Sequence, residues 1–348
     1  MKNKNKSNWN LKILLRNLGK ARWIAVLIGI LVLGFIFSQL NPSFLQIKNL
    51  QNILVQAAVT GVMAIGMTFV IMTAGIDISV GGILYLTLVL ATEFSLRTQI
   101  GQSVPVSIYL VAVVLGTLLG FINGLVINYI GINPLITTLA TLSIYRGLAI
   151  HINQARITIP NQVARFLGIG NIEGIPMPLI ILVIIMIFGM FLLRYTRFGR
   201  YALSVGSSER SAIESGLPVK GVLLGCYALA GLLAGLAGMI LLGRVGAVQT
   251  DIGIGIEFTV ITAVVLGGTL LSGGSASILG SVMGAVFLVM IDNGLNLINA
   301  SAYVYDIVRG SVLVGAVLID RASSLKVLGK FMPKRWTRSK AVDQQTAE

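Results

Sequence analysis

The sequence has little of what soluble enzymes use for chemistry. Its 348 residues include one cysteine, Cys226, and one histidine, His151, and only 11% of them are charged. A single cysteine excludes an intramolecular disulfide and a cysteine-rich metal site. The sequence also has no Gly-x-x-x-x-Gly-Lys-Ser/Thr phosphate loop and no His-Glu-x-x-His zinc motif. We therefore expect neither P-loop ATP hydrolysis nor metal-dependent hydrolysis on this chain, and we interpret it as a non-enzyme.

Apolar residues are what the sequence has in abundance. They make up 55% of the chain, which also has 40 glycines and a mean hydropathy of +0.90. Stretches of roughly 20 apolar residues recur between short polar connections, which is typical of a membrane helix bundle and unlike an outer-membrane barrel. The predicted fold is an all-α polytopic membrane bundle of about ten helices. The expected spans are 23–40, 53–74, 79–97, 104–130, 134–152, 176–194, 219–242, 257–272, 276–298 and 301–319.

The distribution of charge predicts how these spans are oriented. The net charge is +14, with seven Lys and Arg before Trp23 and seven after Asp320. By the positive-inside rule, residues 1–22 and 320–348 form basic cytoplasmic tails around a transmembrane domain at 23–319, and an even number of spans agrees. This placement explains the positive charge without nucleic acid. The first apolar stretch lacks a small-residue cleavage site, so we expect an uncleaved helix.

Two connections are long enough to carry structure: an external loop at 152–175 and an internal loop at 194–220. The internal loop has a helix start at Ser208, with Glu209 at the positive helix end, and a stop at Gly216 before Pro218. These signals predict a two-turn cytoplasmic helix about 12 Å long. A bundle with such a helix and no energy-converting site fits a membrane subunit driven by a separate ATPase. The candidate coupling residues are Ser208, Glu209, Arg210, Ser211, Ala212, Glu214 and Gly216.

Three blocks of sequence resemble the membrane permeases of bacterial ABC sugar importers of the ribose, xylose, galactose and autoinducer-2 type. They are Ala64-Ile65-Gly66-Met67-Thr68 continuing into Gly75-Ile76-Asp77-Ile78-Ser79-Val80-Gly81, the loop from Phe198 to Gly216, and Ala263-Val264-Val265-Leu266-Gly267-Gly268-Thr269 with Leu271-Ser272-Gly273-Gly274. The resemblance covers roughly residues 40 to 320. It implies an inner-membrane permease that carries a pentose, hexose or related small polyol. It also implies a second permease copy or paralogue, cytoplasmic ATPase subunits that hold ATP and Mg, and a periplasmic sugar-binding protein. No cofactor is expected on this chain.

The internal loop departs from the pattern usual in that family, Gly-Gly-Asn-x-x-Ala-Ala-Arg-Leu-Ser-Gly-Ile. Ser208 stands at the Asn position, an exchange that keeps the helix cap. Ser211 and Ala212 replace the two alanines, while Ile213 and Glu214 replace Arg and Leu. The helix is preserved but its contact face is altered. Pairing with a second, different permease therefore stays open beside pairing of two identical copies.

A glycine-punctuated break within the apolar sequence contains one carboxylate, Asp77. A carboxylate at membrane depth is kept for structure or for transport. Because Asp77 can satisfy free amides near Ser79, and the break lies toward the cytoplasmic side, we interpret it as a gate or joint. Arg146 and Arg309 lie within spans and need carbonyls or an acid partner, for which Asp306, Asp292 and Asp77 are the candidates.

Neutral sugars would pass along hydroxyls and amides that exchange many weak hydrogen bonds. The candidates for this path or its gate are Asp77, Ser79, Asn123, Thr137, Thr141, Asn293, Asn296 and Arg309. For each polar residue the alternative is a hydrogen bond between helices. The glycines at Gly231, Gly235 and Gly238 form a small-residue stripe that predicts close helix packing.

Three other functions stay open at this stage. An ion-coupled secondary transporter of small polar solutes would use Asp77 or the arginines in its spans. A membrane-embedded enzyme would need convergent nucleophiles, acids or metal ligands, and one histidine with scattered acids argues against it. An ion channel would need a charged ring or a filter-like repeat, neither of which the sequence shows.

Overall fold

The computed structural model describes residues 23–98, 100, 106–153 and 162–331. The N-terminal tail at 1–22 and the last part of the C-terminal tail, 332–348, lie outside the described residues. The main helices are α2 (Trp23–Leu40), α3 (Ile47–Ile71), α4 (Val80–Arg97), α6 (Ser107–Leu125), α7 (Pro134–Asn153), α8 (Gln162–Ile169), α9 (Met177–Tyr195), α10 (Arg197–Ser207), α11 (Glu209–Glu214), α12 (Val219–Val245), α13 (Ile256–Leu266), α14 (Ile278–Leu297) and α15 (Ala302–Phe331). Short elements complete the order: η1 (Pro42–Leu45), the π-helical turn η2 (Val126–Ile130), and an antiparallel pair, β1 (Asn171–Ile172) and β2 (Ile175–Pro176).

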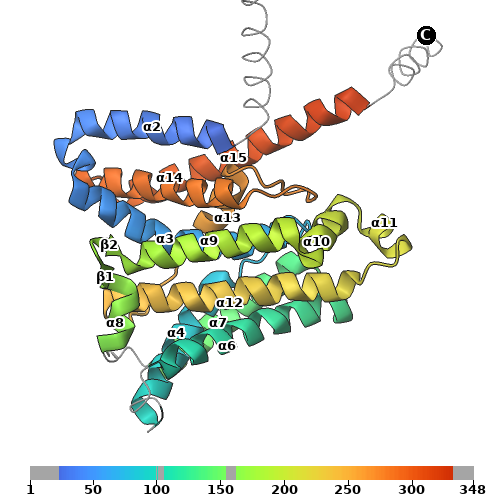
Figure 1. Cartoon of the computed structure of the whole chain (residues 1–348), viewed down its shortest axis with the longest axis horizontal. Helices are drawn as coiled ribbons and strands as arrows, with labels where there is room; N and C mark the ends of the chain where they lie inside the picture. Colours follow the sequence, from blue (N-terminus) through green and yellow to red (C-terminus); the bar gives the residue numbers. More distant parts are fainter. Residues whose placement is uncertain (1–22, 99, 101–105, 154–161, 332–348) are drawn as a thin grey trace, which may run out of the picture.

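The long helices run side by side in one bundle (Figure 1). Helix α12 packs against α6, α3, α4 and α8, and α3 also packs against α14, α9 and α13. In the described part of the chain, eight helices are long and apolar enough to cross a membrane. The predicted all-α membrane bundle is therefore confirmed.

Helices α6 and α12 approach closely because glycines face one another across their contact. A Cβ added at Gly120 would lie 3.0 Å from the Gly231 Cα atom, and one added at Gly116 would lie 3.2 Å from the Gly235 Cα atom. Small residues on both helices let backbones meet in a membrane, where packing replaces the hydrophobic effect. The predicted glycine stripe on α12 thus faces a second stripe on α6.

The predicted span at 257–272 is wrong as one continuous membrane helix. Helix α13 has 11 residues, which gives a length of about 16 Å, whereas the membrane core is about 30 Å thick. Residues 246–255, which precede it, are non-helical, and their three glycines all have positive φ. We call residues 246–255 the non-helical segment. Hydropathy missed this arrangement because it counts apolar residues and does not register the glycines that end the helix.

The last span also differs from the prediction. Helix α15 continues to Phe331, twelve residues beyond the expected end at 319. The charged and small residues after Asp320 end the apolar stretch but are compatible with a helix. Hydropathy therefore marked where the apolar stretch ends, and not where the helix ends.

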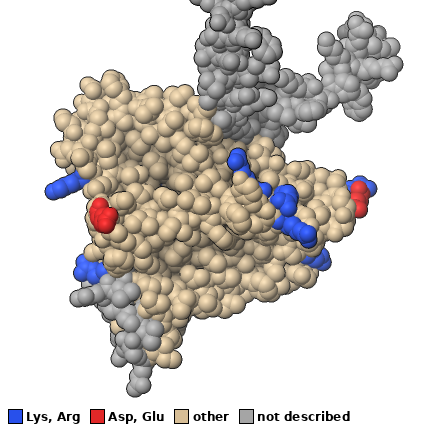
Figure 2. All heavy atoms as spheres, in the orientation of Figure 1, with Lys and Arg blue, Asp and Glu red and all other residues tan. Residues whose placement is uncertain are grey.

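Charged side chains lie at the two ends of the bundle on the face shown in Figure 2, and the band between them is free of charge on that face. The elements α10 and α11, from the predicted internal loop, lie at one end of the helices, and α8, β1 and β2, from the predicted external loop, lie at the other (Figure 1). The described parts of the two long connections therefore carry short helices and strands and lie at opposite ends, while residues 154–161 of the predicted external loop lie outside the described residues. We call these the inner end and the outer end.

Candidate functional site

The inner end carries two short helices joined at Ser208, which we call the elbow (residues 197–216). The Ser208 hydroxyl accepts a hydrogen bond from the Ser211 N–H at 3.2 Å and so caps α11. The chain leaves α11 through Gly216, whose φ of +75° is a conformation that glycine adopts without strain. The start and stop signals predicted from the sequence are thus confirmed.

The α11 helix presents its polar side to the surroundings. Arg210 and Glu214 form an ion pair at 3.0 Å, with side chains 90% and 64% exposed. Ile213 is exposed beside them, whereas Ala212 is buried against the bundle. In Figure 1 the helix stands at the tip of the inner end. The tip therefore exposes two charged side chains and one apolar side chain.

The elbow rests directly on two breaks in the membrane helices: break A (residues 72–79) between α3 and α4, and break B (residues 267–277) between α13 and α14. The Gly274 N–H of break B donates to the Met72 carbonyl of break A at 2.9 Å. Gly206 of α10 lies against both groups, so closely that an added Cβ would clash with the Met72 carbonyl oxygen and lie 2.7 Å from the Gly274 nitrogen. One glycine of the elbow therefore contacts both breaks at once.

Break A is held by a chain of buried hydrogen bonds. The Asp77 carboxylate accepts from the Ser79 N–H at 2.9 Å and from the Ser79 hydroxyl at 2.6 Å, and the Asn123 amide donates to that hydroxyl at 2.7 Å. Tyr145 of α7 donates to the Asn123 side-chain oxygen at 3.2 Å. This chain fixes the start of α4 against α6 and α7. Asp77, Ser79 and Asn123 thus meet in one hydrogen-bonded chain. Tyr145 was missed because a tyrosine within an apolar span gives no signal beyond packing.

The start of α13 meets the start of α4 inside the bundle. Glu257, in the first turn of α13, is 5% exposed, and its Oε2 atom has no hydrogen-bond partner among the described residues. Gly81 of α4 lies against that oxygen, where any larger side chain would clash. The Glu257 carboxyl group therefore lies between the first turns of α13 and α4. Acidic groups near helix N-termini are stabilised by the helix dipole.

Arg146 holds the non-helical segment in place. Its guanidinium donates to the Thr250 carbonyl at 2.8 Å and to the Ile252 carbonyl at 3.3 Å. It also lies 5.3 Å from the centre of the Tyr85 ring, within the range of a cation–π contact. Of the two kinds of partner expected for this arginine, the structure shows carbonyls.

A polar cavity of about 350 Å³ opens toward the outer end between α3, α12, α14 and α15, and we call it the outer cavity. Its lining is polar or charged throughout: Asn52, Gln56, Arg244, Asp292, Asn293, Asn296, Tyr305 and Arg309. Arg309 pairs with Asp292 through two hydrogen bonds, of 3.1 and 2.8 Å. Of the three acids considered for Arg309, the partner is therefore Asp292.

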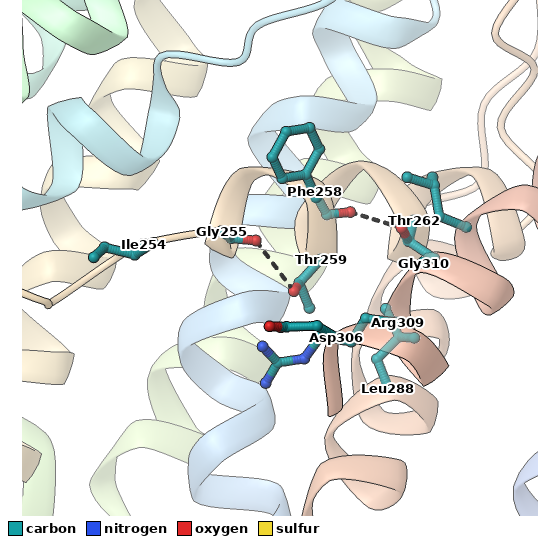
Figure 3. A pocket seen from close by; sticks show the side chains of 10 residues that line it. Ile254, Gly255, Phe258, Thr259, Thr262, Leu288, Asp306, Arg309 and Gly310 are labelled. Carbon is teal, nitrogen blue, oxygen red and sulfur yellow. Dashed lines mark hydrogen bonds between the residues drawn. The ribbon is translucent and has the colours of Figure 1, made fainter. Parts of the chain in front are cut away.

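Two further hollows adjoin the outer cavity. One, of about 210 Å³, shares Gln56, Arg244, Asp292 and Arg309 with it. The other, of about 350 Å³, lies between α13 and α15, and Arg309 and Asp306 extend from α15 toward it (Figure 3). Arg309 lines all three hollows and thus connects them.

The structure separates the remaining predicted path residues. Asn293 and Asn296 line the outer cavity, although Asn293 also forms a reciprocal amide pair with Asn49, with bonds of 2.8 and 2.9 Å. Thr137 and Thr141 lie on α7, where the Thr141 hydroxyl donates to the Thr138 carbonyl at 3.3 Å. Neither threonine lines the outer cavity or joins the Asp77 hydrogen-bond chain.

Arg244, which was not among the predicted site residues, lies in the last turn of α12 and lines two of the hollows. Gln56 was not singled out. A single charge at the end of an apolar stretch indicates only where a membrane helix ends. The position of Arg244 beside residues of distant helices was therefore not predictable from the sequence.

Comparison with known proteins places this geometry in context. The family described as branched-chain amino acid transport system / permease component matches residues 49–317. The ribose import permease protein RbsC of Escherichia coli K12 is 38% identical over 299 residues, covering 84% of this chain and 92% of RbsC. The protein of the same name from Bacillus subtilis is 40% identical over 304 residues, with 85% and 92% covered. The xylose transport system permease protein XylH of Escherichia coli K12 is 30% identical over 362 residues, with 86% and 91% covered. No solved structure matches the chain.

Proposed function

The chain belongs to the family of transport-system permease components that matches residues 49–317, and we propose that it is the membrane subunit of an ATP-driven importer for a small sugar. The observation that carries this proposal is identity of 38% and 40%, over most of the chain, to permeases named for ribose import. The subunit crosses the bacterial inner membrane several times. It contributes no covalent chemistry to transport.

The energy for transport comes, in this proposal, from a cytoplasmic ATPase that binds the elbow and itself holds ATP and Mg. Support comes from α11, a capped helix at the inner end with Arg210, Ile213 and Glu214 exposed. A periplasmic sugar-binding protein delivers the solute at the outer end, where the outer cavity opens. A second copy of this chain or a paralogue completes the translocation path.

Motion of the elbow reaches the membrane helices through Gly206. Because Gly206 contacts the backbone of break A and of break B, a displacement of the elbow moves both breaks together. A pair of helices can rotate about a break without disrupting either helix, so breaks A and B act as hinges. Alternating access then follows from a push at the inner end that reorients α4 and α14.

Uptake by the assembled transporter tests this function. We expect proteoliposomes that contain the permease, its ATPase and its sugar-binding protein to accumulate radiolabelled D-ribose or D-xylose when ATP is supplied on the ATPase side. A non-hydrolysable ATP analogue should abolish accumulation. Failure of every pentose and hexose, with ATPase activity intact, would refute the assignment to sugar import.

A further inference from the structure

Arg244 is a partly buried cation that has no partner among the described residues. It lies in the last turn of α12, and the structure shows no hydrogen bond or ion pair from its guanidinium to any described residue. The guanidinium carries five N–H donors and keeps its charge in proteins. Such a group is normally paired when it is removed from water, because leaving it unpaired is unfavourable. Its donors instead border the outer cavity and the 210 Å³ hollow beside it.

The groups opposite Arg244 complement it. Asp292 is held by Arg309 through both carboxylate oxygens and still has lone pairs to offer toward the cavity. Gln56 and Asn296 add amides that can donate or accept, and Tyr305 adds an aromatic ring. Arg309 and Asp292 neutralise each other in their ion pair, whereas Asp306 lines only the adjoining hollow between α13 and α15. The outer cavity therefore offers one carboxylate acceptor beside the arginine fork of Arg244.

We propose that Arg244 and Asp292 form a binding site for neighbouring hydroxyl groups of a neutral sugar at the outer end of the translocation path. The arginine fork donates to two hydroxyl oxygens while the carboxylate accepts their hydrogens, a pairing that a monosaccharide offers and an apolar solute does not. The cavity volume of about 350 Å³ lies within the usual range for small-molecule sites. This inference rests on the proposed import function and names where the sugar first contacts the membrane subunit.

The first test compares Arg244→Gln with a matched control in the fully assembled transporter. Arg97→Gln removes the same charge at the outer end from a side chain that is 72% exposed and outside the cavity. With saturating sugar-loaded binding protein, we expect Arg244→Gln to import D-ribose at least tenfold more slowly, with binding-protein-stimulated ATP hydrolysis within twofold of the unmodified protein. Arg244→Lys should restore only part of the import, because lysine lacks the fork. Import by Arg244→Gln at the rate of Arg97→Gln would overturn the proposal.

The second test measures sugar at the site itself and does not depend on transport. Cys226 is fully buried, so an Asn52→Cys substitution provides one accessible thiol in the lining of the outer cavity. In the assembled transporter, we expect D-ribose, but not glycine betaine at equal osmolality, to slow modification of this thiol by a small methanethiosulfonate reagent at least twofold. Adding Arg244→Gln should abolish the protection. Equal protection in both backgrounds, or none in either, would refute the site.

The two tests also distinguish this site from the function on which it rests. If the unmodified assembly imports no sugar, the proposed function fails. If it imports sugar and Arg244→Gln behaves as Arg97→Gln does, only the site fails. Loss of stimulated ATP hydrolysis identifies a variant that does not fold. If Arg244→Gln does not fold, the thiol measurement with and without Arg244→Lys, which keeps the charge, decides whether the site binds sugar.

Discussion

Replacing Gly206 with alanine should uncouple the elbow from the membrane helices. The added Cβ would clash with the Met72 carbonyl oxygen and lie 2.7 Å from the Gly274 nitrogen and 2.8 Å from the Met72 carbonyl carbon. All of these are backbone atoms, so no flexible side chain can move aside. The substitution must either separate break A from break B, losing the 2.9 Å bond between Met72 and Gly274, or lift the elbow from both.

The size of the effect follows from the cost of overpacking. Inserting a methyl group into a close-packed contact costs about 1–3 kcal/mol. If that strain falls only on the conformation with the junction closed, the population of this conformation drops by roughly 5–150-fold. Since coupled turnover requires the junction, sugar uptake should fall by a factor in that range. Membrane insertion and binding of the ATPase to α11 should be unaffected.

The assay is sugar uptake per ATP hydrolysed in proteoliposomes that contain the assembled transporter. Gly221→Ala is a matched control, because Gly221 lies near the same end in α12 and an added Cβ there meets nothing within 4 Å. We expect Gly221→Ala to transport normally and Gly206→Ala to lose transport while the complex still assembles. Normal coupling in Gly206→Ala would show that the elbow does not act through the two breaks.

Three further outcomes are expected. Gly216→Val should abolish transport-linked ATP turnover while the protein still inserts, because valine at a φ of +75° is strained by at least about 1–2 kcal/mol; normal turnover would contradict the coupling role of α11. Asp77→Ala should lower the melting temperature of the purified permease more than Asp77→Asn, since asparagine keeps an oxygen for Ser79 and a bond to a charged group contributes about 1.5–3 kcal/mol. A switch in sugar preference by Asp77→Asn would show that the residue is a ligand and not a joint. Arg309→Ala and Asp292→Ala should be non-additive in thermal stability by about 1 kcal/mol, and strict additivity would mean that their ion pair contributes nothing.

The sequence predicted most helix boundaries well because membrane helices obey a simple length rule. The span expected at 79–97 is α4 at Val80–Arg97, and the span at 176–194 is α9 at Met177–Tyr195. The cap at Ser208 and the stop at Gly216 were predictable for a similar reason, since each depends on a residue's own backbone and its near neighbours.

The site was only partly predictable because it depends on contacts between distant segments. Asn123 was singled out, but its place in a chain from Asp77 to Tyr145 arises from break A and from α6 and α7, which the sequence does not order in space. Arg244 had only the signal of a charge at a helix end, and its place in the same cavity lining as Asp292 depends on the spatial order of α3, α12, α14 and α15. The separation of Thr141 from these groups likewise follows from the position of α7.

The central claim is that a separate cytoplasmic ATPase drives this subunit through its elbow. Energising one set of proteoliposomes in two ways tests this claim. The permease alone should accumulate no D-ribose under an imposed proton or sodium gradient. The same permease with its ATPase and binding protein should concentrate the sugar when ATP is added. Uphill uptake by the lone permease under an ion gradient would contradict the account and identify an ion-coupled transporter.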